Sequence, residues 1–334
     1  MRKKLFSNIT VIGDGGWGTT LAKLLAEKNF CVTMWGPFPE NLHDIARCRE
    51  NKKYLPGIKI PKSIRFISDL TTAVSSADLL ILAIPSQYLD GVLKKIRKTN
   101  YYGKPIVSVI KGIDTKTFMT MSQLIEKELG KTPLAVLSGP TIALEVARKI
   151  PTTAVIASDD KTLRDLLQDV FSCEYFRIYT NDDVVGVEIC GSVKNIIALA
   201  CGICDGLGFG TNTKAAILTR GLVEMARLGR ALKAEPSTFF GLTGLGDLAT
   251  TCFSTSSRNR YVGHELGKGR KIKAILSSMD AVAEGVVTAK AVYKLARKLK
   301  IEMPITEAVY RVIYKAHLPG KIVKDLMGRS LKAE

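Results

Sequence analysis

Residues 8–25 read NITVIGDGGWGTTLAKLL, and this stretch decides the fold. The β-branched run 9–12 predicts a buried strand, and the apolar residues after the glycines recur at helical spacing. Between them Gly13, Gly15 and Gly18 have the spacing G-x-G-x-x-G. Glycines in this context allow a tight turn, close approach of a pyrophosphate and close packing of helix on strand. The helix start adds N–H groups for the phosphates, so the sequence predicts a dinucleotide-binding unit.

Strand and helix signals alternate as far as residue 179. This alternation is typical of a Rossmann-type doubly wound α/β fold, a mostly parallel sheet with helices on both faces. Segment 51–57 is predicted to be a loop. The predicted strands are 31–35, 64–67, 79–84, 106–110, 135–137, 153–157 and 175–179, and the predicted helices are 40–50, 69–76, 86–98, 116–129, 141–149 and 160–172.

Beyond this region the strand signals vanish and helical periodicity dominates. The sequence therefore predicts a dinucleotide-binding domain, residues 1–183, followed by an all-α C-terminal domain, residues 184–334. A cleft between two such domains is the usual place for chemistry. The helices predicted for the second domain are 184–204, 213–233, 256–268, 285–300 and 304–316.

The charge balance is strongly basic, with 49 Lys and Arg against 31 Asp and Glu. Such an excess favours anionic partners, although a solvated basic surface explains it equally well. The basic residues are scattered rather than gathered into a stripe, so a nucleic-acid partner is not expected. No stretch of about twenty apolar residues lacks charge, so we expect no stable membrane insertion.

Cysteine and histidine usage points to a cytoplasmic protein without a metal. Seven cysteines without a regular framework indicate reduced thiols and a cytosolic compartment. Cys201 and Cys204 form one C-x-x-C, which has no second pair and falls inside an apolar helical run, so we interpret it as core packing. The three histidines have no ligand spacing.

A lysine and an aspartate in the second domain are candidates for chemistry. Lys194 interrupts an apolar helix, and lysine is almost never fully buried without a partner. It either points outward or faces a cleft, and the small Gly191 and Ser192 favour the cleft. Asp247 is a lone acid in the glycine-rich segment 241–250 and needs a cation, for which Lys194 is the obvious candidate. Alternatively, Asp247 only caps a helix.

Two segments could receive an anion. Residues 254–260, STSSRNR, begin a helix with hydroxyls, an amide and two guanidiniums. Arginine binds phosphate with two hydrogen bonds in one plane, so this start could hold a phosphate monoester. An ordinary serine cap with solvated arginines is the alternative. Residues 138–141, SGPT, are a second strand-to-helix junction, since proline is favoured in the first turn of a helix.

The end of the second strand leaves the choice of nucleotide open. NAD-binding units often place an acid about 20 residues after the glycines, where it holds the ribose hydroxyls. Here that place is Trp35-Gly36-Pro37, with neither an acid nor a base. The position therefore does not decide between NAD and NADP.

Together these motifs resemble the bacterial NAD(P)-dependent glycerol-3-phosphate dehydrogenases over essentially the whole chain. In this sequence Thr141 and Gly16 stand where the family usually has serine. Gly36 and Pro37 replace a basic or histidine residue of many members, which weakens an NADP assignment. The motifs that carry the resemblance are Gly13-x-Gly-x-Trp-Gly18, Tyr54-Leu-Pro-Gly57, Ile110-Lys-Gly112, Ser138-Gly-Pro140, Glu188-x-Cys-Gly-x-x-Lys-Asn195, Gly244-Leu-Gly-Asp247, Ser257-Arg-Asn259 and Glu284-Gly285.

The resemblance implies hydride transfer between NAD or NADP and a small molecule. The reaction would interconvert sn-glycerol 3-phosphate and dihydroxyacetone phosphate and supply glycerol 3-phosphate for phospholipid synthesis, with Lys194 as general acid/base. The resemblance is also compatible with a homodimer. By family position the substrate-binding residues are Lys111, Gly139, Thr141, Lys194, Asp247, Ser257, Arg258 and Asn259. The cofactor-binding residues are Gly13, Gly15, Gly16, Trp17, Gly18, Tyr54, Lys111, Ala143, Arg258, Val282 and Glu284.

Two other interpretations remain. A 3-hydroxyacid or 6-phosphogluconate dehydrogenase also pairs such a nucleotide fold with a helical domain and a lysine. A noncatalytic nucleotide-sensing or nucleic-acid-binding protein would rest only on the net charge of +18.

Overall fold

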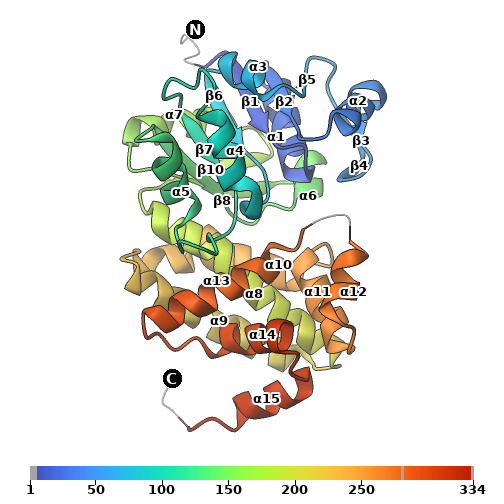
Figure 1. Cartoon of the computed structure of the whole chain (residues 1–334), viewed down its shortest axis with the longest axis vertical. Coiled ribbons are helices and arrows are strands. Elements are labelled where there is room, and N and C mark those ends of the chain that lie inside the picture. Colours follow the sequence, from blue (N-terminus) through green and yellow to red (C-terminus); the bar gives the residue numbers. More distant parts are fainter. Residues whose placement is uncertain (1–5, 280–281, 332–334) are drawn as a thin grey trace. The chain divides into compact units, whose positions relative to one another are not determined.

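The computed structural model describes residues 6–279 and 282–331, and the chain divides into two compact units (Figure 1). The first unit comprises residues 1–111 and 119–184, and the second comprises residues 112–118 and 185–334. The short segment 112–118 thus belongs with the C-terminal helices, although the chain reaches it from the sheet.

The described part of the first unit is built on an eight-stranded sheet in the order β10-β9-β8-β7-β6-β1-β2-β5. Neighbouring strands run parallel except β8 and β9, which are antiparallel. The prediction of a mostly parallel sheet is therefore confirmed. The strands are β1 (Asn8–Ile12), β2 (Cys31–Trp35), β5 (Arg65–Ile67), β6 (Leu79–Leu82), β7 (Ile106–Ser108), β8 (Leu134–Ser138), β9 (Thr152–Ala157) and β10 (Phe176–Asn181).

Helices cover both faces of this sheet. Strand β6 is buried throughout, with Leu79 and Ile81 in one apolar cluster and Leu80 and Leu82 in another. Helices α1 and α7 pack in the first cluster, and α3, α4 and α5 pack in the second. The helices are α1 (Gly16–Glu27), α2 (Pro39–Cys48), α3 (Leu70–Ser75), α4 (Leu89–Ile96), α5 (Met121–Leu129), α6 (Ala143–Ala147) and α7 (Lys161–Phe171), and a 3-10 turn, η1 (Ser86–Tyr88), precedes α4.

Several predicted boundaries in the first unit were wrong. The predicted loop 51–57 contains part of a hairpin, β3 (Glu50–Asn51) and β4 (Leu55–Lys59), whose turn is closed by a hydrogen bond from the Tyr54 N–H to the Asn51 side chain. The helix predicted at 116–129 begins only after Thr120, which forms a capping box with Gln123.

The helix predicted at 141–149 is also shorter than expected. It begins at Ala143 and ends at Ala147, so Pro140 does not lie in its first turn. The reason is the residue before the proline: Gly139 has a φ of +141°, a conformation incompatible with a helix, and the chain turns into the helix only after Ile142.

The described residues of the second unit contain helices and no strand, which confirms the all-α prediction. The short α10, α12 and α15 were not predicted, because each is too brief to show a clear helical period. The helices are α8 (Val184–Gly206), α9 (Thr211–Ala231), α10 (Asp247–Phe253), α11 (Arg258–Gly267), α12 (Ile272–Ser277), α13 (Glu284–Lys298), α14 (Pro304–Lys315) and α15 (Pro319–Met327), with a 3-10 turn, η2 (Pro236–Phe240), and a π-helical turn, η3 (Leu242–Gly246).

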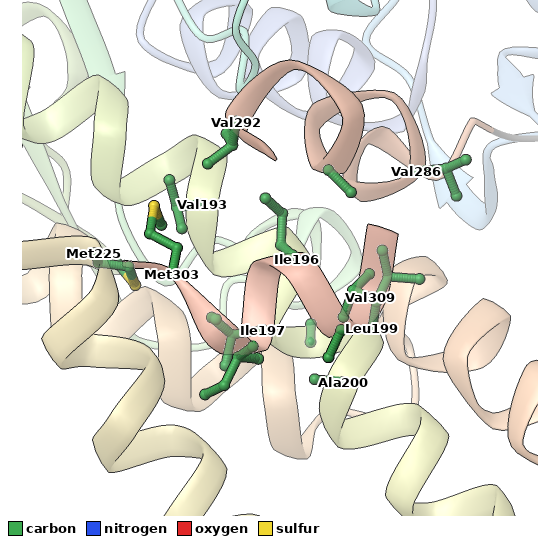
Figure 2. Packing of buried hydrophobic residues seen from close by; sticks show 14 of the residues in the cluster. Val193, Ile196, Ile197, Leu199, Ala200, Met225, Val286, Val292, Met303 and Val309 are labelled. Atoms are coloured by element: carbon green, nitrogen blue, oxygen red, sulfur yellow. The ribbon is translucent and has the colours of Figure 1, made fainter. Parts of the chain in front are cut away.

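Helix α8 is the centre of this unit. By length and composition it could cross a membrane, but 89% of its most apolar window is buried, as in the core helix of a globular domain. Its neighbours α9, α13 and α14 contribute apolar side chains to the same cluster. Figure 2 shows residues that gather there: Val193, Ile196, Ile197, Met225, Val292, Met303 and Val309.

Helices α8 and α11 touch backbone to backbone. A Cβ atom at Gly202 would collide with the Arg260 carbonyl, and one at Gly263 would collide with the Leu199 carbonyl. Gly206 and Gly267 extend the same contact by one turn of each helix. The glycines therefore hold the first turn of α11 close against α8.

A buried carboxylate joins α9 to the start of α14. Glu224 is 2% exposed, and burial raises its pKa to about 7. Its two oxygens accept hydrogen bonds from the N–H groups of Ile305 and Thr306 at 2.5 and 3.1 Å and from the Thr306 hydroxyl at 3.0 Å. Glu224 thus satisfies N–H groups that the helix itself leaves without partners.

Replacing Glu224 with alanine should lower the free energy of unfolding by about 1–3 kcal/mol, because two buried N–H groups lose their acceptors. Urea denaturation followed by circular dichroism measures this change. Glu307→Ala, which alters an exposed acid in the same first turn of α14, is the control and should have a much smaller effect. Equal stability of Glu224→Ala and the unmodified protein would show that the cap is unimportant.

Candidate functional site

The glycine-rich loop has the shape that a pyrophosphate requires. Gly13 has a φ of +128° and donates its N–H to the Trp35 carbonyl at 2.8 Å, and a Cβ atom there would strike the Ala83 carbonyl. A Cβ on Gly18 would strike Gly13. At Gly15, by contrast, no described atom lies within 4 Å of the Cβ position, so this side of the loop is open.

The start of α1 faces the loop with N–H groups available for an anion. Gly15 is the N-cap, and no side chain of the described residues caps this helix. The backbone at Gly16 approaches the Tyr54 carbonyl, 2.6 Å from where a Cβ would lie, and Ala143 is next to it. Four of the predicted cofactor residues therefore lie together at the start of α1, where a dinucleotide phosphate could bind. These are Gly15, Gly16, Tyr54 and Ala143.

Trp17, another predicted cofactor residue, points its side chain elsewhere. Its indole packs edge-on against Phe176, with ring centroids 6.2 Å apart. The side chain therefore belongs to the core of the first unit, and the backbone of Trp17 is the part available to a nucleotide.

Three predicted substrate residues meet at the ends of β7 and β8. The Lys111 ammonium donates to the Gly139 carbonyl at 3.2 Å, and the Thr141 hydroxyl donates to the same oxygen at 3.3 Å. The carboxyl ends of parallel strands are the usual ligand edge of such a sheet. This corner combines a cation, a hydroxyl and a glycine with positive φ.

In the second unit Lys194 is held inside the protein. The residue is 6% exposed, and its ammonium donates to the carboxylate of Asp247 and to the Thr251 hydroxyl at 2.6 Å. Asp247 also begins α10, so the cation partner and the position at a helix start are both present. Thr251 was missed by sequence reasoning, although its place four residues after Asp247 on one helix is a signal for it.

The first turn of α11 lies beside the helix that carries Lys194. The Asn259 amide donates to the Asn195 side chain at 3.0 Å and accepts from the Gly285 N–H at 2.9 Å. Asn259 is 8% exposed and thereby connects α8, α11 and the start of α13, where Glu284 is the first residue and Val282 lies two positions earlier.

Ser257 and Arg258 complete this turn. The Ser257 side chain caps α11 by accepting from the Arg260 N–H at 3.2 Å. The predicted serine cap is therefore present. Arg258, the first residue of the helix, is exposed.

The two arginines of this segment have different environments. The Arg260 guanidinium donates to Asp205 at 2.6 Å and to the Phe253 carbonyl at 3.1 Å, and Lys214 contacts the other Asp205 oxygen at 2.9 Å. Partial burial would raise the pKa of Asp205, but hydrogen bonds from Lys214 and Arg260 hold it below its ordinary value. Arg260 therefore ties the start of α11 to Asp205 and Phe253, and Arg258 stays the arginine predicted to bind the substrate.

Every predicted site residue lies within the described residues. In the described part of the chain no group of three His, Cys, Asp or Glu residues is placed to hold a metal ion.

Comparison with known proteins covers both units. Family models match residues 8–164 as the N-terminal part, and residues 183–324 as the C-terminal part, of NAD-dependent glycerol-3-phosphate dehydrogenase. A "glycerol-3-phosphate dehydrogenase [NAD(P)+]" of Chlorobium limicola is 47% identical over 330 residues, covering 98% of this chain and 99% of the relative. The protein of the same name from Geobacillus kaustophilus is 46% identical, covering 98% of this chain and 96% of the relative.

A solved structure agrees with these matches. The crystal structure of glycerol-3-phosphate dehydrogenase from Coxiella burnetii superposes with a TM-score of 0.94 at 36% identity, covering 97% of this chain and 100% of that chain. Both family models match, and the alignment with these enzymes covers nearly the whole chain. The chain therefore belongs to the NAD(P)-dependent glycerol-3-phosphate dehydrogenase family.

Proposed function

We propose that this protein interconverts sn-glycerol 3-phosphate and dihydroxyacetone phosphate, with Lys194 as the general acid/base. The observation that carries the proposal is the buried ammonium of Lys194, oriented by Asp247 and Thr251. A charge is costly to bury, so its position inside an apolar helix is best explained by a chemical role. Family membership supports the reaction itself.

The residues present fit a bound NAD or NADP. Gly13, Gly15 and Gly18 with the start of α1 would hold the pyrophosphate, and the backbone near Tyr54 and Ala143 would border it. When bound, the nicotinamide supplies the hydride for reduction of the substrate C2 and accepts it in the reverse direction.

Lys194 would donate and accept the proton of this reaction. As the ketone is reduced, negative charge develops on its oxygen, and the ammonium stabilises that charge and donates the proton that completes the hydroxyl group. In the reverse direction the neutral amine takes the proton from the hydroxyl group. Asp247 and Thr251 would fix the direction of the ammonium, and such orientation is a large part of catalysis.

The phosphate would be bound by the start of α11. Arg258 and the N–H groups of the first turn offer a charged fork and a positive dipole end. Asn259 joins this turn to Asn195, the residue after Lys194, so the phosphate receptor and the ammonium belong to one fixed arrangement. We assign Lys111 with Gly139 and Thr141 to the substrate as well.

We further propose that the product serves phospholipid synthesis in the cytoplasm. Support comes from family membership and from the seven cysteines, which carry thiols rather than disulfides. Glycerol 3-phosphate supplies the three-carbon backbone of these lipids.

Removing the amine should lower turnover sharply and spare nucleotide binding. For Lys194→Met we expect kcat to fall by about 10²- to 10⁴-fold, since the proton transfer loses its catalyst. NADH oxidation with dihydroxyacetone phosphate measures kcat, and NADH fluorescence measures binding. Lys273→Ala, on an exposed face of α12, is the matched control. Because Lys194→Met leaves Asp247 buried without its cation, Lys194→Met/Asp247→Asn tests the same point in a neutral site; full activity in either variant would remove Lys194 from the mechanism.

Arg258→Ala should raise KM for dihydroxyacetone phosphate by about 10- to 100-fold, the loss expected for charged hydrogen bonds to a phosphate. Steady-state kinetics at saturating NADH gives this value. Arg297→Ala, which removes an exposed arginine of α13, should leave KM unchanged. A KM that is also unchanged in Arg258→Ala would contradict the phosphate role.

Asp205→Asn should disturb the phosphate receptor indirectly. With a weaker partner, Arg260 would hold the first turn of α11 less firmly, so KM for dihydroxyacetone phosphate should rise several-fold while kcat at saturation changes little. Asp205→Glu keeps the charge and should recover part of the affinity. If Asp205→Asn instead lowered kcat alone, the residue would act on the chemical step and not on this turn.

A further inference from the structure

The residue between the first two glycines of the loop reaches the end of β2. Asp14 packs its side chain against Gly36, the residue that directly follows β2. A Cβ atom on Gly36 would lie 2.6 Å from the Asp14 Cγ and 2.8 Å from its Oδ2. The Asp14 carboxylate therefore occupies the space that a side chain at position 36 would fill.

This place normally decides between the two nicotinamide nucleotides. In Rossmann units an acid near the end of β2 accepts hydrogen bonds from the adenosine ribose of NAD, whereas a nearby arginine accommodates the 2′-phosphate of NADP. Position 36 has no side chain here, and neighbouring Trp35 and Pro37 are uncharged. The carboxylate is nevertheless present, because it comes from Asp14.

The carboxylate is fixed and has capacity for another hydrogen bond. The Asn41 side chain donates to Asp14 Oδ2 at 2.5 Å, and the Asn51 side chain donates to the Asp14 carbonyl at 2.8 Å. Asp14 is 7% exposed. A carboxylate can accept about four hydrogen bonds, so a ribose hydroxyl can be added to the contact from Asn41.

Within the described residues the Asp14 carboxylate forms no ion pair. A 2′-phosphate would therefore approach a negative group without the arginine that usually receives it. Two like charges at short distance in a partly buried site repel strongly.

We propose that Asp14 is the specificity-determining residue for the nucleotide, and that it makes the protein prefer NAD(H) to NADP(H). Its carboxylate accepts a hydrogen bond from the adenosine ribose hydroxyl and repels a 2′-phosphate. The inference concerns nucleotide binding alone and does not depend on which substrate is reduced.

Direct binding tests this assignment without any turnover. Titration calorimetry should give a dissociation constant for NADH at least about tenfold below that for NADPH at the same salt concentration, as expected for a carboxylate facing a phosphate dianion. In Asp14→Asn and Asp14→Ala the gap should narrow, mainly through tighter NADPH binding. Asp165→Asn removes one acid from an exposed face of α7 and should leave both constants unchanged.

Fragments without nicotinamide provide a second measurement on the unmodified protein. ADP-ribose should compete with NADH more strongly than 2′-phospho-ADP-ribose, whether or not the Asp14 variants keep their fold. Equal or tighter binding of NADPH and of the phosphorylated fragment would overturn the proposal, as would an unchanged ratio in well-folded Asp14→Asn. Either result would leave the assignments of Lys194 and Arg258 intact.

Discussion

The second unit depends on the contact between the Lys194 ammonium and the Asp247 carboxylate. Burying either charge alone would cost several kcal/mol, and only a partner in good geometry offsets that cost. The contact therefore requires α10 to pack against α8 with Asp247 at its start. The approach to α10 is correspondingly tight: a Cβ atom at Gly244 would collide with the Phe239 backbone, so glycine is required there. Glycine at position 244 thus lets the chain pass close to Phe239 directly before Asp247 begins α10.

The same helix also positions the first turn of α11. Asn195 follows Lys194 on α8 and binds Asn259 of α11, while further along the two helices touch at Gly202 and Gly263. Arg260 fixes the start of α11 from its other side through Asp205. Three different interactions, namely an amide pair, a backbone contact and an ion pair, therefore set the position of the turn that carries Arg258.

Local patterns in the sequence predicted much of this arrangement. The strand–glycine–helix signal identified the loop because the order of a strand, spaced glycines and a helix can be read locally, and the contact of Gly18 with Gly13 lies within that stretch. The pairing of Lys194 with Asp247 followed from the cost of a buried charge. Helix periodicity also distinguished the all-α second unit from the α/β first unit, since amphipathic helices of three or more turns show a clear period.

Other features depend on contacts that a pattern does not reveal. The late start of α6 depends on the conformation of Gly139, whereas the sequence alone suggested a helix that follows Pro140 directly. The spacing of Asp247 and Thr251 places them side by side only on a helix, and α10 was not predicted. The sequence showed no acid at the end of β2. The structure shows that the carboxylate beside Gly36 comes from Asp14, a residue earlier in the chain.

The glycine contact between α8 and α11 has a thermodynamic consequence. Helices whose backbones touch cannot slide or separate without opening a void, since close-packed interiors transmit displacement instead of absorbing it. The ammonium and the first turn of α11 are then already in place before a ligand arrives. Little conformational entropy is lost when the ligand binds, and more of the interaction energy remains available as affinity. A small metabolite with few atoms benefits most from such a rigid receptor.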